Sequence, residues 1–194
     1  MRTLSLSRAT RETEISLSLN LDGSRNIQVD TGVGFFDHML TAFAFHSGFD
    51  FILSAKGDLQ VDCHHTVEDV GILLGKALGQ LFTDKSGLCR YGSAYVPMDE
   101  SLGFAALDIS GRPFLVFDCS FQNERVGAFD CCMAKEWFRA VAFQAGLTLH
   151  LRCLYGENDH HKLEALFKAF GQALYQGSRI SGEKGVFSTK GILE

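Results

Sequence analysis

Residues 62–71, DCHHTVEDVG, share an unusual pattern with residues 159–168, DHHKLEALFK. Each stretch contains two adjacent histidines with a glutamate shortly after them. The members are His64, His65 and Glu68 in the first stretch and, at a constant offset of 96 residues, His160, His161 and Glu164 in the second. A motif that recurs at one register indicates an internal repeat in the chain.

The similarity extends on both sides of the histidine pairs. The stretch AFAFHSG at 42–48 matches AVAFQAG at 140–146, and LLGKAL at 73–78 matches AFGQAL at 169–174. The offset is 98 residues for the first pair and 96 for the second, so the second copy lacks two residues between them. We therefore interpret residues 1–194 as a single domain of two similar halves, about 1–92 and 93–194.

The hydrophobic pattern of the first half predicts strands and two helices. Apolar residues alternate with polar ones over 14–22, as in a strand with one buried face, and the Asp22-Gly23 turn makes 26–32 the candidate partner strand. Residues 35–46 are too densely apolar for a half-exposed strand and precede Gly48, so they predict a helix. Residues 50–62 predict two short strands around 56–58, and residues 66–82 a second helix.

The second half predicts the same elements in the same order. Residues 93–121 are rich in strand patterns with a turn at Gly111-Arg112-Pro113, and the strand-like stretch 147–156 corresponds to 49–58. Two sheets, each carrying a pair of helices, would bury their helix faces against one another. We therefore predict an α+β fold in which the helices are packed between two β-sheets.

Composition and charge exclude several classes of protein. Hydrophobic residues make up 46% of the chain and the net charge is −5, with no basic run of the kind that binds nucleic acid. The first residues lack the apolar core of a secretory signal, and no uncharged apolar stretch is long enough to span a membrane. None of the six cysteines forms a CxxC pair, so we expect a reducing, cytoplasmic location.

The repeated histidine pairs point to metal binding, although a polar helix start without chemistry is the simpler reading of either copy alone. Adjacent side chains on a helix point about 100° apart, so one ion rarely takes both rings. Two pairs therefore suggest two ions, each binding one ring from each half. Imidazole and carboxylate donors suit Mn, Fe, Co or Zn. His38 and its repeat counterpart Glu136 are further candidate ligands.

Several motifs, read together, resemble the imidazoleglycerol-phosphate dehydratase family. They run in order through nearly the whole chain: GFFDHML, DCHHTVEDVGILLG, RYG, VPMDESL, DISGRP, TLHLRCLYGENDHHKLEALFKAFGQAL and STKG. The resemblance implies a fold like that of domain 2 of ribosomal protein S5. It also implies a large homo-oligomer, an octahedral 24-mer, with a small phosphate-bearing substrate and two Mn²⁺ ions in each active site between subunits.

The resemblance also implies a division of the ligands between the two ions. One ion would be held by four residues, which are His64, Glu68, His160 and Glu136. The other would be held by His38, His65, His161 and Glu164. Position 136 carries histidine in many relatives, so Glu136 is a departure from the family pattern, and a carboxylate is a donor that Mn²⁺ accepts.

The same resemblance implies roles in dehydrating D-erythro-imidazole glycerol phosphate to imidazole acetol phosphate during L-histidine biosynthesis. Glu12 would be the general base, although Glu14 would face the same way on a strand, and Asp99, His64 and Glu68 would also be catalytic. The implied substrate-binding residues are Glu12, His38, His46, His64, His65, Glu68, Arg90, Arg112, Ser188 and Lys190. Of these, Arg90, Arg112, Ser188 and Lys190 match the family's phosphate-binding positions.

Two other functions are compatible with the same ligands. A dinuclear metallohydrolase would use them to activate water. A metal-stapled assembly protein would use the ions only to join subunits. No Walker loop, dinucleotide fingerprint or nucleophile motif is present in the sequence.

Overall fold

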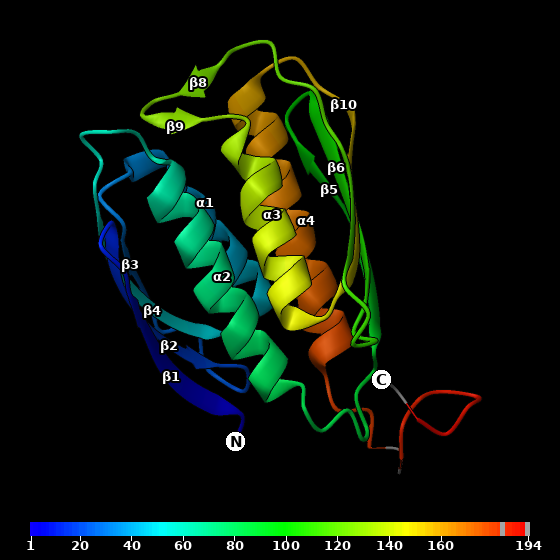
Figure 1. The fold of residues 1–194 in the computed structure, drawn as a ribbon. Coiled ribbons are helices and arrows are strands. Elements are labelled where there is room, and N and C mark those ends of the chain that lie inside the picture. Colours follow the sequence, from blue (N-terminus) through cyan, green and yellow to red (C-terminus); the bar gives the residue numbers. More distant parts are fainter. Residues whose placement is uncertain (183–184, 193–194) are drawn as a thin grey trace.

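The computed structural model describes residues 1–182 and 185–192 and has two four-stranded sheets with four long helices between them (Figure 1). The first half contains β1 (Thr3–Ala9), β2 (Thr13–Asn20), β3 (Ile27–Asp30), α1 (Gly34–Ser47), β4 (Asp50–Gly57) and α2 (His64–Leu81). The second half contains β5 (Tyr91–Met98), β6 (Ser101–Asp108), β7 (Phe114–Asp118), α3 (Met133–Ala145), β10 (Thr148–Tyr155) and α4 (Asp159–Ser178). A small ribbon of β8 (Arg125–Val126) and β9 (Phe129–Asp130) precedes α3.

The two halves have the same topology. The strand order is β1-β2-β4-β3 in the first sheet and β5-β6-β10-β7 in the second. In each sheet the last strand along the chain runs antiparallel to the second strand and parallel to the third. The predicted α+β fold with an internal duplication and helices between two sheets is therefore confirmed.

Two local predictions in the first half are wrong. Residues 26–32 do form a strand, but β3 pairs in parallel with β4 and not with the strand at 14–22, whose other partner is β1. The reason is that α1 connects β3 to β4, as a parallel pair requires a crossover helix. Residues 50–62 contain one strand, β4, followed by a turn, because the chain bends at residues 58–62 to begin α2.

The helices share one hydrophobic core that contains residues from both halves. Helix α1 packs against α4 and α2 packs against α3, while α2 and α4 also cover the inner faces of the two sheets. Aromatic side chains fill the centre: the Trp137 and Phe167 rings stack with centroids 4.7 Å apart, and those of Phe43 and Phe170 with centroids 5.2 Å apart. Such dense packing fixes the helices relative to one another.

Glycines permit the closest contacts between layers. A Cβ atom on Gly92 of β5 would lie 1.8 Å from the Ala173 carbonyl oxygen of α4, which is part of the backbone and cannot turn away. A Cβ atom on Gly71 of α2 would lie 3.0 Å from the Trp137 carbonyl oxygen of α3. No helix within the described ranges is long and apolar enough to cross a membrane.

We expect Gly92→Ala to lower the free energy of unfolding, because β5 would have to move away from α4. Overpacking of this kind costs about 1–3 kcal/mol. Gly34→Ala is the control, since a Cβ atom at Gly34 meets no atom within 4 Å. Urea unfolding of both variants measures the difference, and equal stability of Gly92→Ala and the wild type would contradict the observed packing.

Candidate active site

Both histidine pairs lie at the first turns of long helices. His64 and His65 begin α2, and His160 and His161 lie in the first turn of α4. The side chain of Asn158 caps α4 by accepting a hydrogen bond from the His160 amide. Helices α2, α3 and α4 run in the same direction, so these starts lie at the end of the molecule that carries β8 and β9 (Figure 1). The duplication thus brings its repeated histidines to one end.

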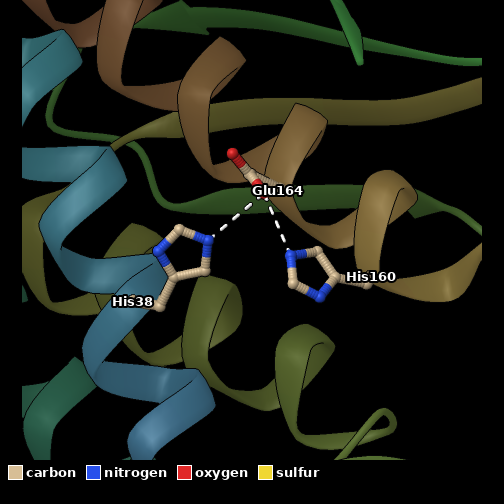
Figure 2. Close-up of side chains that lie close together, drawn as sticks. All are labelled: His38, His160 and Glu164. Carbon is tan, nitrogen blue, oxygen red and sulfur yellow. Dashed lines mark hydrogen bonds and ion pairs between the residues drawn. The ribbon is translucent and has the colours of Figure 1, made fainter. Parts of the chain in front are cut away.

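His38, His160 and Glu164 form a group that could hold a metal ion (Figure 2). Their donor atoms all lie within 4.8 Å of one another, and within the described ranges they are the only group found of this kind. His38 Nε2 is 3.3 Å and His160 Nε2 is 3.1 Å from Glu164 Oε2. Two imidazoles and a carboxylate from α1 and α4 are a donor set that fits a divalent ion such as Mn²⁺.

Glu164 is the buried member of this group. Burial alone would raise the pKa of the Glu164 carboxyl, but the Lys168 ammonium and the His38 ring outweigh it and lower that pKa below its usual value. Lys168 Nζ lies 2.6 Å from Glu164 Oε1. Glu164 is therefore held as a carboxylate, the form that a metal ion needs.

The residues around the first histidine pair make matching contacts. His64 Nε2 lies 3.7 Å from Glu68 Oε2 one turn along α2. His65 Nδ1 bonds the Asp58 carboxylate at 3.0 and 3.1 Å, while His65 Nε2 lies 3.8 Å from Glu12 Oε2. We call these five residues the first histidine cluster.

The second pair repeats this arrangement from different loops. His161 Nδ1 lies 2.7 Å from Glu100 Oε2, and His161 Nε2 lies 3.7 Å from Asp99 Oδ2. Asp99 and Glu100 form the hairpin between β5 and β6, where Asp99 has a positive φ of 47° that aspartate tolerates better than most residues. The second histidine cluster consists of His38, Asp99, Glu100, His160, His161 and Glu164.

The two clusters share an arrangement for aiming a ring. In each, a carboxylate holds Nδ1 of the second histidine and leaves Nε2 facing another acidic group. The hydrogen bond that the ring donates to Asp58 raises the pKa of His65, and the one donated to Glu100 raises the pKa of His161. Glu100 also accepts the Glu157 and Asn158 amides, which with His161 hold its own pKa well below the usual range. Such outer partners typically orient histidine ligands.

The predicted ligands are not gathered into two complete sets within one chain. His160 lies with His38 and Glu164, whereas the predicted set places it with His64, Glu68 and Glu136. Glu136, in the first turn of α3, is 3.4 Å from Arg139. The described contacts do not join the first cluster to the second, so the predicted division of ligands would need residues from more than one copy of the chain.

His46 lies away from both clusters. It is two turns beyond His38 on α1, which separates the two residues by about 12 Å along the helix axis. Its Nδ1 atom is 3.4 Å from Gln172 Nε2 on α4. Partial burial, with the nearby Lys168 and Arg25 charges, lowers the pKa of the His46 ring. Its predicted contact with substrate stays a prediction.

All four predicted phosphate-binding residues line one cavity of about 560 Å³, which we call the C-terminal pocket. Its lining includes Arg90, Arg112, Ser188 and Lys190, together with Ser181 and other residues of 185–192. The Arg90 guanidinium is already engaged, since it bonds both Asp108 oxygens at 2.7 and 2.9 Å and the Phe187 carbonyl at 2.7 Å. The exposed Arg112 and Lys190 side chains make no ion pair within the described ranges, which leaves these two cations for an anion.

The C-terminal pocket lies at the opposite end of the helices from the histidine clusters. The Arg90 amide donates to the Gly177 carbonyl in the last turn of α4, while His161 lies in its first turn. The intervening residues span about 25 Å at the rise of an α-helix. The substrate that the family resemblance implies, an imidazole with a three-carbon phosphate arm, is far shorter and would not reach both places in one chain.

Three residues near the clusters were missed from the sequence. Asp58 and Glu100 hold the rings of His65 and His161, and Asp69 accepts the Thr13 hydroxyl at 2.6 Å and pairs with Arg8 at 2.8 Å. Thr13 directly follows Glu12, so this buried contact anchors the turn that carries Glu12. In the sequence, the feature that could have identified Asp58 and Glu100 is an acidic residue in a turn at the end of a predicted strand.

Comparisons with known proteins agree on one family. The family described as imidazoleglycerol-phosphate dehydratase matches residues 31–174. Enzymes of that name from Listeria welshimeri and Acetivibrio thermocellus are 57% and 55% identical, covering 100% and 99% of both chains. The solved imidazoleglycerol-phosphate dehydratase from Staphylococcus aureus has 42% identity and a TM-score of 0.83, over 92% of this chain and 99% of its own. IGPD from Pyrococcus furiosus has 37% identity and the same TM-score, over 97% and 100%.

We expect Glu100→Gln to weaken Mn²⁺ binding by about 10–100-fold, the usual effect of losing a residue that orients a histidine ligand. Glutamine can still accept the two amides of 157–158 but no longer presents a charged oxygen to His161. Calorimetric titration of metal-stripped protein measures the affinity. Glu157→Gln is the matched control, since only the backbone of Glu157 contacts Glu100, and equal affinities for the two variants would contradict the role of Glu100.

Proposed function

The chain belongs to the imidazoleglycerol-phosphate dehydratase family, and is therefore a hydro-lyase of histidine biosynthesis, and we propose that each active site combines histidine clusters and a C-terminal pocket from different copies. The observation that carries this proposal is the placement of two sets of site residues at opposite ends of α4. Membership of this family excludes the two alternative functions, a metallohydrolase and a metal-stapled assembly protein. The division of the site between copies is our inference.

The proposed reaction is the dehydration of D-erythro-imidazole glycerol phosphate to imidazole acetol phosphate. The carbonyl of the product lies on the middle carbon of the side chain, so the hydroxyl must leave from the carbon beside the ring. The proton must come from the middle carbon, and together they leave as one water. The site therefore has to hold the ring, accept a proton from carbon and hold the phosphate.

The donor set of the histidine clusters fits two Mn²⁺ ions per site. His38, His160 and Glu164 supply one group of donors within a chain, and His64 and Glu68 make the equivalent contact on α2. The Nε2 atoms of His65 and His161 face Glu12 and Asp99, and Glu136 stays a proposed ligand. When bound, Mn²⁺ would stabilise negative charge on the imidazole ring of the substrate and orient it.

Glu12 is the proposed general base. Its carboxylate is exposed in the turn between β1 and β2 and lies 3.8 Å from His65 Nε2. The Glu12 amide bonds Thr10 Oγ1 at 3.1 Å, its carbonyl accepts from the Asp58 amide, and Thr13 is tied to Asp69. A carboxylate on a turn that is already fixed can accept a proton from the substrate without the entropy cost of ordering a loop. Asp99 holds the equivalent place beside His161 and is proposed to contact substrate from a second copy.

The C-terminal pocket is proposed to bind the phosphate. Arg112 and Lys190 supply the uncommitted positive charge, and Ser188 supplies a hydroxyl in the same lining. Arg90 is better placed to hold the wall of the pocket, because Asp108 and the Phe187 carbonyl already occupy its donors. Guanidinium is well suited to binding phosphate through paired hydrogen bonds.

Closing such a site requires a homo-oligomer, and we propose the octahedral 24-mer expected for the family. Because the two halves have the same order of elements, the chain has two related surfaces. Each carries a histidine pair at the start of its second helix, α2 or α4. A cytoplasmic location is part of the same proposal, and the six cysteines, none of which forms a disulfide in the structure, are compatible with it.

We expect Glu12→Gln to lower the turnover number by about 100-fold or more, which is the scale of general-base catalysis, while Mn²⁺ content stays unchanged. Glu14→Gln is the matched control, because Glu14 is equally exposed two residues later on β2. Turnover and metal content are measured on both variants. A Glu12→Gln enzyme with near-normal turnover would contradict the role of Glu12, and an inactive Glu14→Gln would move that role to the neighbour.

We expect chelation of the metals to abolish dehydration of imidazole glycerol phosphate, because the histidine clusters would no longer hold the ring. Adding Mn²⁺ should restore formation of imidazole acetol phosphate. The product is followed chromatographically, with bound metal measured on the same samples. Full activity in protein verified to be metal-free would contradict the metal dependence, and release of inorganic phosphate in place of dehydration would contradict the reaction.

A further inference from the structure

Cys119, directly after β7, and Cys153 of β10 lie side by side, outside the two histidine clusters and the C-terminal pocket. Strand β7 runs parallel to β10, and the last pair in register is Asp118 with Arg152. Cys153 is the next residue of β10 and Cys119 is the first residue after β7, so a register continued by one residue sets them opposite one another. Neighbouring strands lie about 4.8 Å apart, within the roughly 4.4–6.8 Å between Cα atoms that a disulfide needs.

The two thiols lie close enough to affect each other's pKa. The Cys119 thiol hydrogen-bonds Cys153, which lowers the pKa of Cys153 to about 7 against the opposing effect of burial, with the Lys162 charge helping. The same contact, with burial, raises the pKa of Cys119 well above its usual range. Both side chains are half-buried, so a small oxidant can reach them.

The other four cysteines lack this combination. Cys63 and Cys131 are buried, and burial raises the pKa of the Cys63 thiol and raises that of Cys131 to about 11. Cys89 is half-buried and Cys132 is exposed, and within the described residues neither thiol has a cysteine partner across a strand. A thiolate beside a resolving thiol is the arrangement that favours reversible oxidation over irreversible damage.

We propose that Cys119 and Cys153 form a reversible oxidation site, at which a hydroperoxide converts the two thiols into an intrachain disulfide. The Cys153 thiolate attacks one peroxide oxygen, which gives a sulfenic acid and, with hydrogen peroxide, one water after protonation. Cys119 sulfur then attacks the sulfenic sulfur and displaces the second water. Two electrons pass from the thiols to the peroxide, and a thiol reductant reverses the change by disulfide exchange.

The disulfide would link two segments that support the start of α4. The Ser120 carbonyl accepts from Lys162 Nζ at 3.2 Å, and the amides of 122–123 donate to Asp159. On the other strand, the residues after β10 donate the two amides that hold Glu100. The oxidation site is therefore adjacent to the second histidine cluster but shares no residue with it.

The test treats the assembled, Mn²⁺-loaded protein with hydrogen peroxide near neutral pH, alkylates the remaining thiols and maps the peptides by mass spectrometry. We expect a disulfide between Cys119 and Cys153, with the loss of two hydrogens, that dithiothreitol reverses. Cys119→Ser should accumulate a sulfenic acid on Cys153 that dimedone traps. Cys153→Ser should consume peroxide about tenfold more slowly, since an ordinary thiol is largely protonated near neutral pH.

Cys132→Ser is the control, because it removes an exposed thiol that the proposal does not use. It should form the same disulfide at the wild-type rate, and all three variants should elute at the oligomer size of the wild type. First oxidation at Cys132 or Cys89 in the wild type, or a disulfide only between chains, would overturn the proposal. So would equal peroxide consumption by folded Cys153→Ser and wild-type protein.

Discussion

The length of α4 is the constraint on which the rest of the structure depends. This helix is buried between the second sheet and α1, and its 20 residues keep a fixed distance of about 30 Å between its ends. Its first turn carries His160, His161 and Glu164, and its last turn receives the Arg90 amide at the edge of the C-terminal pocket. Because a small substrate cannot span that distance, the proposed metal and phosphate sites of one chain cannot both contact the same substrate molecule.

The duplication explains how one chain can present two related sets of ligands. Equivalent strands, helices and turns bring a histidine pair, an aiming carboxylate and a second acidic group together in each half. The two sets differ in burial, because Glu164 is only 8% exposed and pairs with Lys168, whereas Glu68 is 42% exposed. The fold therefore provides two similar but chemically distinct sets of side chains.

The repeat in the sequence predicts most of the fold, since the spacing of His-His-x-x-Glu and of the helix motifs is preserved in the element order of both halves. The partner of β3 could not be predicted that way, because the Asp22-Gly23 turn indicates a hairpin while the crossover through α1 makes β3 a partner of β4. His160 and Glu164 lie close together because residues four apart share one face of a helix, which the spacing alone indicates. Asp58 and Glu100 were missed, because they reach the histidines from turns of other elements and only tertiary structure brings them there.

Mixed oligomers of two inactive variants test the division of the site between copies most directly. Glu12→Gln damages the histidine end of the chain and Arg112→Ala damages the C-terminal pocket, so each variant alone should have little activity at low substrate concentration. If the two ends belong to different copies, co-assembly restores intact sites, roughly a quarter of the total under random mixing. Dehydratase activity of co-expressed, doubly tagged oligomers well above that of the separate variants is the predicted result. Activity no higher than the average of the two variants would show that Glu12 and Arg112 serve the same site from one chain, and would contradict the account.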